Sequence, residues 1–65
     1  MTEQAETLRT ELRVAARSAM QFGASDAQIN FIVSLAVKNN DFNILGGAGR
    51  LTKREASAII DTMKK

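Results

Sequence analysis

The chain has 65 residues, no cysteine and no histidine, and a net charge of +2 from nine Lys and Arg against seven Asp and Glu. A chain of this length forms one small domain, residues 1–65, without a disulfide and without the ligands of the usual structural zinc sites. Because thiol nucleophiles and imidazole bases are also absent, we expect neither an enzyme nor a bound metal or cofactor.

Residues 2–22 are predicted to form the first helix. Their apolar residues recur at spacings of three and four and so form one stripe: Ala5, Leu8, Leu12, Ala15, Ala19 and Phe22. Arg9, Arg13 and Arg17 form a basic line on another side of the helix, which is either a solvated face or a phosphate-binding face. Gly23 is predicted to take the left-handed conformation that commonly ends a helix.

Residues 26–39 are predicted to form a central helix, which starts at a capping box of Ser25 and Gln28. Its main apolar face comprises Ile29, Ile32, Val33, Ala36 and Val37. Phe31 and Leu35 lie behind that face, so only a narrow polar strip remains for water. Such a helix must be covered from two directions, and we expect the segments on either side of it to be helices packed on its flanks.

The polar cluster Asn39, Asn40 and Asp41 is predicted to end the central helix. In the following connection Phe42, Ile44 and Leu45 are expected to form an apolar lid, and residues 43–50 form a Gly-rich loop. The glycines of this loop match neither a Walker-type phosphate loop nor a calcium-binding loop.

Residues 53–64 are predicted to form the third helix. Thr52 and Glu55 make a capping box, and Leu51 and Ala56 a hydrophobic staple. The core stripe of this helix comprises Ala56, Ile59, Ile60 and Met63. Lys53 and Arg54 occupy the first two helical positions, where the helix dipole favours negative charge. They are either solvated side chains or part of a phosphate-binding site.

Two runs of the sequence resemble a known pattern. They are Ser25-Asp26-Ala27-Gln28-Ile29-Asn30-Phe31-Ile32-Val33-Ser34-Leu35 and Leu51-Thr52-Lys53-Arg54-Glu55-Ala56-Ser57-Ala58-Ile59-Ile60-Asp61. Together they resemble a small helical module of bacterial and bacteriophage proteins, in which a Gln-x-x-Phe/Tyr-Ile-x-x-Leu helix is paired with a Leu-Thr-Lys-x-Glu-Ala-Ser helix. The resemblance implies a helical fold that is sometimes attached to proteins handling nucleic acid. It implies no defined activity.

These observations predict an all-α, three-helix domain that acts as a non-enzymatic binding module. The favoured partner is nucleic acid, contacted at its phosphates through the basic C-terminal part of the chain: Arg50, Lys53, Arg54, Lys64 and Lys65. Base reading is not expected, because the chain lacks Tyr and Trp and the second connection is too long for a helix-turn-helix turn.

The alternative is a protein-interaction module, either a homodimer or a phage-type inhibitor of a host protein. Its interface would use apolar residues that lie off the main helix stripes: Val14, Met20, Phe31 and Leu35. The longest uncharged run, between Asp26 and Lys38, is too short to span a bilayer. The sequence begins without the features of a secretory signal, so we expect a cytoplasmic protein of a bacterial or phage-infected cell.

Overall fold

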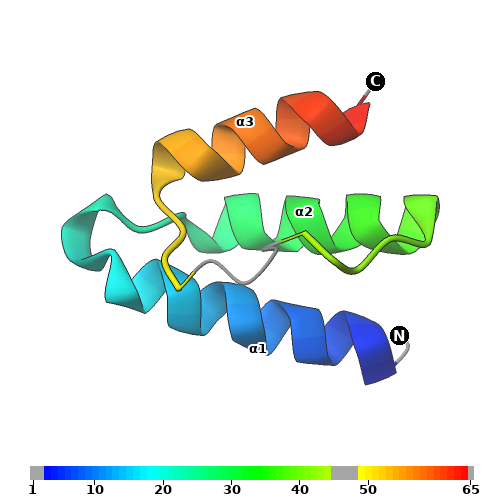
Figure 1. The fold of residues 1–65 in the computed structure, drawn as a ribbon, viewed down its shortest axis with the longest axis horizontal. Coiled ribbons are helices and arrows are strands. Elements are labelled where there is room, and N and C mark those ends of the chain that lie inside the picture. Colours follow the sequence, from blue (N-terminus) through cyan, green and yellow to red (C-terminus); the bar gives the residue numbers. More distant parts are fainter. Residues whose placement is uncertain (1–2, 45–48, 65) are drawn as a thin grey trace.

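The residues that the structure describes form three α-helices and one short 3-10 helix, which confirms the predicted all-α class (Figure 1). The computed structural model describes residues 3–44 and 49–64. The elements are α1 (Glu3–Ser18), η1 (Met20–Phe22), α2 (Asp26–Asn39) and α3 (Lys53–Lys64). The predicted bounds of the second and third helices are confirmed, and the first helix ends earlier than predicted.

The central element is α2, which packs against both α1 and α3. α1 runs antiparallel to α2, whereas α3 runs in the same direction as α2 (Figure 1). Two side-chain hydrogen bonds hold this parallel pair. Gln28 donates to the Lys53 carbonyl (3.2 Å) where both helices begin, and Asn39 donates to the Met63 carbonyl (3.3 Å) where both end.

The parallel arrangement explains the long connection between α2 and α3. Because both helices start at the same end of the molecule, residues 40–52 must return along a helix of roughly 20 Å. Phe42 and Ile44 pack against the core on the way back, which confirms the predicted lid for these two residues. Leu45 and the glycines Gly46 and Gly47 of the predicted loop lie outside the described residues.

The core lies on both sides of α2. It is lined by Leu8, Leu12 and the small residues of α1, by the main face of α2, and by two residues at the start of α3. Its buried members are Ala5, Leu8, Leu12, Ala15, Ala16, Ile29, Ile32, Val33, Ala36, Leu51 and Ala56. Ile59, Ile60 and Met63 cover this core while half-buried. Within the described residues no polar or charged residue is buried, so apolar packing is the main stabilising contribution.

The predicted starts of α2 and α3 are confirmed. At α2, the Gln28 amide donates to the Ser25 hydroxyl (3.2 Å), and the Ser25 amide donates to the Gln28 side-chain oxygen (3.0 Å). At α3, the Glu55 amide donates to the Thr52 hydroxyl (3.1 Å), and the Thr52 amide donates to the Glu55 carboxylate (3.3 Å). Both capping boxes therefore form as the sequence predicts.

The end of α2 is also where the polar cluster predicts it. Asn40 takes the left-handed conformation (φ 53°), and its amide donates to the Ala36 and Val37 carbonyls. The Asp41 amide also donates to the Ala36 carbonyl (3.0 Å), which completes a Schellman motif. Asn is one of the few residues other than Gly that adopts this conformation at low cost.

The predicted end of the first helix was wrong in three respects. The α-helix stops at Ser18, and residues 20–22 form η1, whose first residue, Met20, has a positive φ of 57°. This break rotates Phe22 off the apolar stripe, so its side chain is 66% exposed instead of buried. Gly23 has an extended conformation (φ −67°, ψ 154°), not a left-handed one.

One residue of the predicted main apolar face of α2 is exposed instead of buried. Val37 is 45% exposed, because its position lies at the margin of the face that α1 covers.

Candidate nucleic-acid interface

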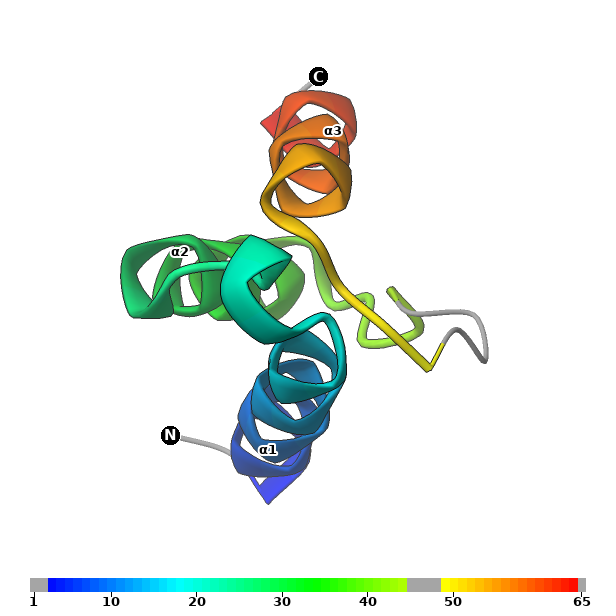
Figure 2. The ribbon, with the colours of Figure 1, turned by 90° about the vertical axis from the view of Figure 1, so that its left-hand side faces the viewer.

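One end of the molecule gathers the end of α1, all of η1 and the starts of α2 and α3 (Figure 2). Backbone hydrogen bonds hold these segments together. The Leu51 amide donates to the Ala15 carbonyl (3.0 Å), and the Ala24 amide donates to the Leu51 carbonyl (3.0 Å). Gly23 and Thr52 also form an isolated antiparallel bridge. We call this end of the molecule the helix-start end.

Lys53 and Arg54 lie at the helix-start end, on the first turn of α3. Both are exposed, and they line a hollow of about 480 Å³ together with Gln21, Phe22 and Thr52. In the described part of the chain, neither cationic group has a hydrogen-bonding or ion-pair partner. The side chains are therefore available to an anion from outside.

The nearby carboxylate of Glu55 is already engaged. Its Oε1 accepts from the Thr52 hydroxyl (3.1 Å) and from the Thr52 amide (3.3 Å). This carboxylate caps its own helix and does not neutralise Lys53 or Arg54 by pairing with them. The local positive charge at the start of α3 is thus retained.

The 3-10 helix η1 stands beside this hollow and presents apolar side chains to solvent. Met20 is 84% exposed and Phe22 is 66% exposed. The other side of η1 borders a second hollow of about 450 Å³, which Arg13, Arg17 and Met20 line together with Asp26. Residues of η1 therefore line both the hollow that contains Arg13 and Arg17 and the hollow that contains Lys53 and Arg54.

Phe22 is a surface residue that the sequence pattern does not reveal. Its spacing continues the apolar stripe of α1, so periodicity alone assigns it to the core. The spacing is misleading because the α-helix breaks after Ser18, and no Gly or Pro within the helix marks that break. Arg17 carried a usable signal, because it extends the basic line to the last turn of α1.

The predicted nucleic-acid-binding residues do not all come together. Arg50 is exposed and precedes Leu51, which is bonded to the last turn of α1, so it lies near the helix-start end with Lys53 and Arg54. Lys64 lies at the opposite end of α3, with its ammonium 5.5 Å from the centre of the Phe31 ring. Lys65 lies outside the described residues.

The predicted interface residues Val14, Met20, Phe31 and Leu35 are also spread over the molecule. Val14 is 59% exposed and lies about 200° around α1 from the buried Leu12, so it points away from α2. Phe31 is 44% exposed beside Lys64, and Leu35 is half-buried. Because Met20 belongs to η1, these four residues do not share one face.

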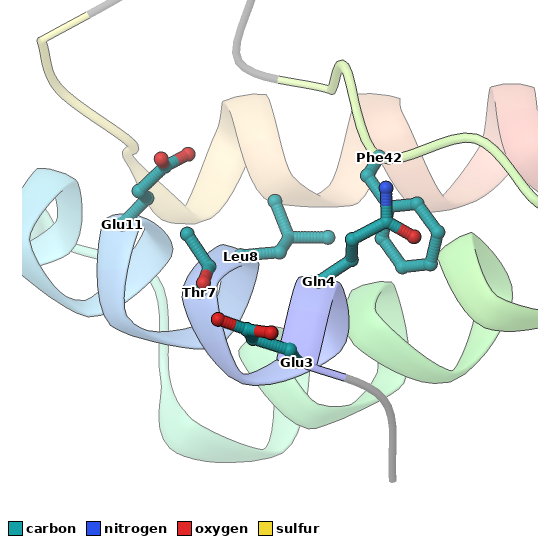
Figure 3. Close-up of a pocket in the computed structure, with 6 residues that line it drawn as sticks. All are labelled: Glu3, Gln4, Thr7, Leu8, Glu11 and Phe42. Carbon is teal, nitrogen blue, oxygen red and sulfur yellow. The ribbon is translucent and has the colours of Figure 1, made fainter.

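A further hollow, of about 320 Å³, lies along α1. In Figure 3 the side chains of Glu3, Thr7 and Glu11 line it, and the Phe42 ring lies beside Gln4. Its two carboxylates disfavour phosphate, in contrast to the cations at the helix-start end. Across residues 3–44 and 49–64, no group of three or more His, Cys, Asp or Glu side chains is placed to hold a metal ion.

Comparison with protein-family models, curated proteins and solved structures found no match for this chain. The resemblance to a bacterial and bacteriophage helical module therefore stays a prediction. No helix in the described residues has the length and apolar character that crossing a membrane requires.

Proposed function

We propose that this chain is a non-enzymatic binding module that contacts nucleic-acid phosphates through the basic start of α3. Lys53 and Arg54 make the main contacts, and Arg50 adds a third cation. Phosphate is the expected ligand because Arg and Lys side chains supply most of the charge that proteins use to bind nucleic-acid backbones. A cytoplasmic site of action belongs to the same proposal.

The observation that carries the proposal is the placement of Lys53 and Arg54. The positive end of a helix dipole disfavours cations, yet two adjacent cations occupy the first turn of α3. Both line a hollow and neither has a partner among the described residues. A phosphate in that hollow would receive charge from both side chains and would also be favoured by the helix dipole itself.

The test is the double substitution Lys53→Glu and Arg54→Glu, with binding measured by fluorescence anisotropy of a labelled oligonucleotide over a series of salt concentrations. Each phosphate contact contributes about 0.7 to 0.9 to the slope of log affinity against log salt. We therefore expect weaker binding at low salt and a slope that flattens by roughly that amount for each residue.

The matched control is Lys38→Glu with Lys64→Glu, which changes the net charge equally but at the other end of α2 and α3. This control should keep most of the wild-type salt slope. Equal losses in both double variants would show that only overall charge matters. An unchanged slope after the Lys53 and Arg54 substitutions, or wild-type protein that binds no DNA at low salt, would remove the proposal.

A second candidate is a protein-interaction module, including a homodimer. The observation that favours it is the set of large apolar side chains that the single chain leaves exposed: Val14, Met20, Phe22, Phe31 and Val37. Light scattering at high micromolar concentration, together with melting at several protein concentrations, decides this question. A dimer gives twice the monomer mass and a melting temperature that rises with concentration.

A further inference from the structure

We propose that the helix-start end binds a single strand of nucleic acid, which crosses η1 with one base stacked on Phe22. Phosphates on one side of that base would contact Lys53 and Arg54, and phosphates on the other side Arg13 and Arg17. This inference rests on the proposed function and adds to it the form of the nucleic acid, the path of the strand and a stacking residue.

Phe22 is the first observation behind this inference. It is the most exposed aromatic side chain among the described residues, at 66%, and it lines the same hollow as Lys53 and Arg54. Single-strand binding proteins combine an exposed aromatic ring with nearby cations, because every base has a face that stacks and every linkage has a phosphate. Bases inside a duplex are already stacked on their neighbours and do not offer that face to a protein ring.

The second hollow is the other observation, and it is independent of α3. Arg13 and Arg17 are neighbours on one face of α1, both are exposed, and both line this hollow. Asp26 lines it too, so two guanidinium groups oppose one carboxylate there. No partner for either guanidinium group lies within the described part of the chain.

The geometry of η1 connects the two hollows. Met20 lines the hollow of Arg13 and Arg17, whereas Gln21 and Phe22 line the hollow of Lys53 and Arg54. Figure 2 shows η1 between the end of α1 and the start of α3. Because η1 contributes residues to both hollows, a strand that binds both pairs of cations passes over η1, where Phe22 is available for stacking. A protein or lipid partner would use the same cations without needing an unpaired base.

The experiment compares a single-stranded oligonucleotide of deoxythymidine, the corresponding oligouridine and a duplex of equal length, at one low salt concentration. Wild-type protein should bind both single strands more tightly than the duplex. Phe22→Ala should weaken single-strand binding by roughly fivefold to a hundredfold, the range of one lost base–aromatic stack. Duplex binding should stay within about twofold, because no stack is lost there.

Two further variants separate stacking from simple apolar contact and from misfolding. Phe22→Leu keeps an apolar side chain without a ring and should lose nearly as much affinity as Phe22→Ala. Val14→Ala removes another exposed apolar side chain, on the outer side of α1, and should bind as the wild type does. Circular dichroism should show that all three variants keep the wild-type fold.

A fluorescent base analogue reports stacking on Phe22 directly. An oligonucleotide carrying 2-aminopurine should lose fluorescence when the wild type stacks on it, and should not lose it with Phe22→Ala. The double variant Arg13→Gln and Arg17→Gln should keep that fluorescence change at saturation but flatten the single-strand salt slope by about 0.7 per residue.

The outcomes distinguish this inference from the proposed function. If Phe22→Ala binds single strands as the wild type does, or if the duplex binds equally well, the single-strand inference is overturned. The phosphate site on α3 still stands in that case, provided that the Lys53 and Arg54 substitutions weaken binding. Wild-type protein that binds none of the oligonucleotides overturns both.

Discussion

Gly23 occupies the position where the chain leaves η1 and passes against the last full turn of α1. A Cβ atom placed on it would lie 2.0 Å from the Ala16 carbonyl oxygen and 2.8 Å from the Ala16 carbonyl carbon. Both distances are far below van der Waals contact, and both atoms belong to the backbone. Glycine is therefore required here for close approach of two backbone segments, not for a left-handed torsion angle.

We expect Gly23→Ala to lower the free energy of unfolding by about 2 kcal/mol or more, because one backbone segment must move away from the other. For a domain of this size, each kcal/mol corresponds to roughly 4 to 8 °C of melting temperature. Thermal unfolding followed by circular dichroism measures the shift. Gly49→Ala is the matched control, because a Cβ on Gly49 meets nothing within 4 Å. Similar melting temperatures for the two variants would contradict this account of Gly23.

Helix α3 carries cations at both ends. Lys64 lies in its last turn, where the negative end of the dipole favours it. Lys53 and Arg54 lie in the first turn, where the dipole opposes them, so each raises the free energy of the folded helix by some tenths of a kcal/mol. The helix is stable in spite of them because Ala56 and Leu51 are buried beside its capping box.

The double variant Lys53→Glu and Arg54→Glu should therefore be slightly more stable than the wild type, by about 0.3 to 1 kcal/mol. Repulsion from Glu55 limits the gain. The control variant Lys38→Glu and Lys64→Glu should be less stable, because it places acids near two helix C-termini. Urea denaturation of the three proteins gives this order. If both double variants lose the same stability, the dipole argument for α3 does not hold.

The stability of the fold depends on how completely α1 and α3 cover α2. Ile32 is fully buried, whereas Ile60 on α3 is only half-buried. Total stability for a chain of this length is expected to be about 3 to 10 kcal/mol. The loss of stability from truncating one core side chain is thus a large fraction of the total free energy of unfolding.

Ile32→Ala should lower the free energy of unfolding by about 2 to 5 kcal/mol. Ile60→Ala should lower it less, because the Ile60 side chain is only half-buried. Val14→Ala should change the free energy of unfolding little, since Val14 is 59% exposed and Ala favours a helix more than Val does. Urea denaturation of the three variants tests this order. A variant Ile32→Ala as stable as Val14→Ala would mean that α2 is not the centre of the core.

The elements whose signals are local follow from the amino-acid sequence alone. Ser25 with Gln28 and Thr52 with Glu55 define two helix starts through bonds between residues three positions apart. Asn40 marks the end of α2 by an equally local signal, since its left-handed conformation depends on hydrogen bonds to the preceding turn. The cations Lys53 and Arg54 also stand out from local helix electrostatics alone.

How these elements pack together depends on contacts between residues that are distant in the sequence. The parallel pairing of α2 and α3 depends on contacts over more than twenty residues, such as Gln28 with the Lys53 carbonyl. Phe22 lies outside the core because the α-helix ends at Ser18 and the chain then turns, which brings Gly23 against Ala16. The spacing of apolar residues does not indicate this turn. The hollow of Arg13 and Arg17 and the hollow of Lys53 and Arg54 both border η1 because of the same turn. Periodicity reports which face of one helix is buried, whereas the relative placement of two faces depends on how the connections between them fold.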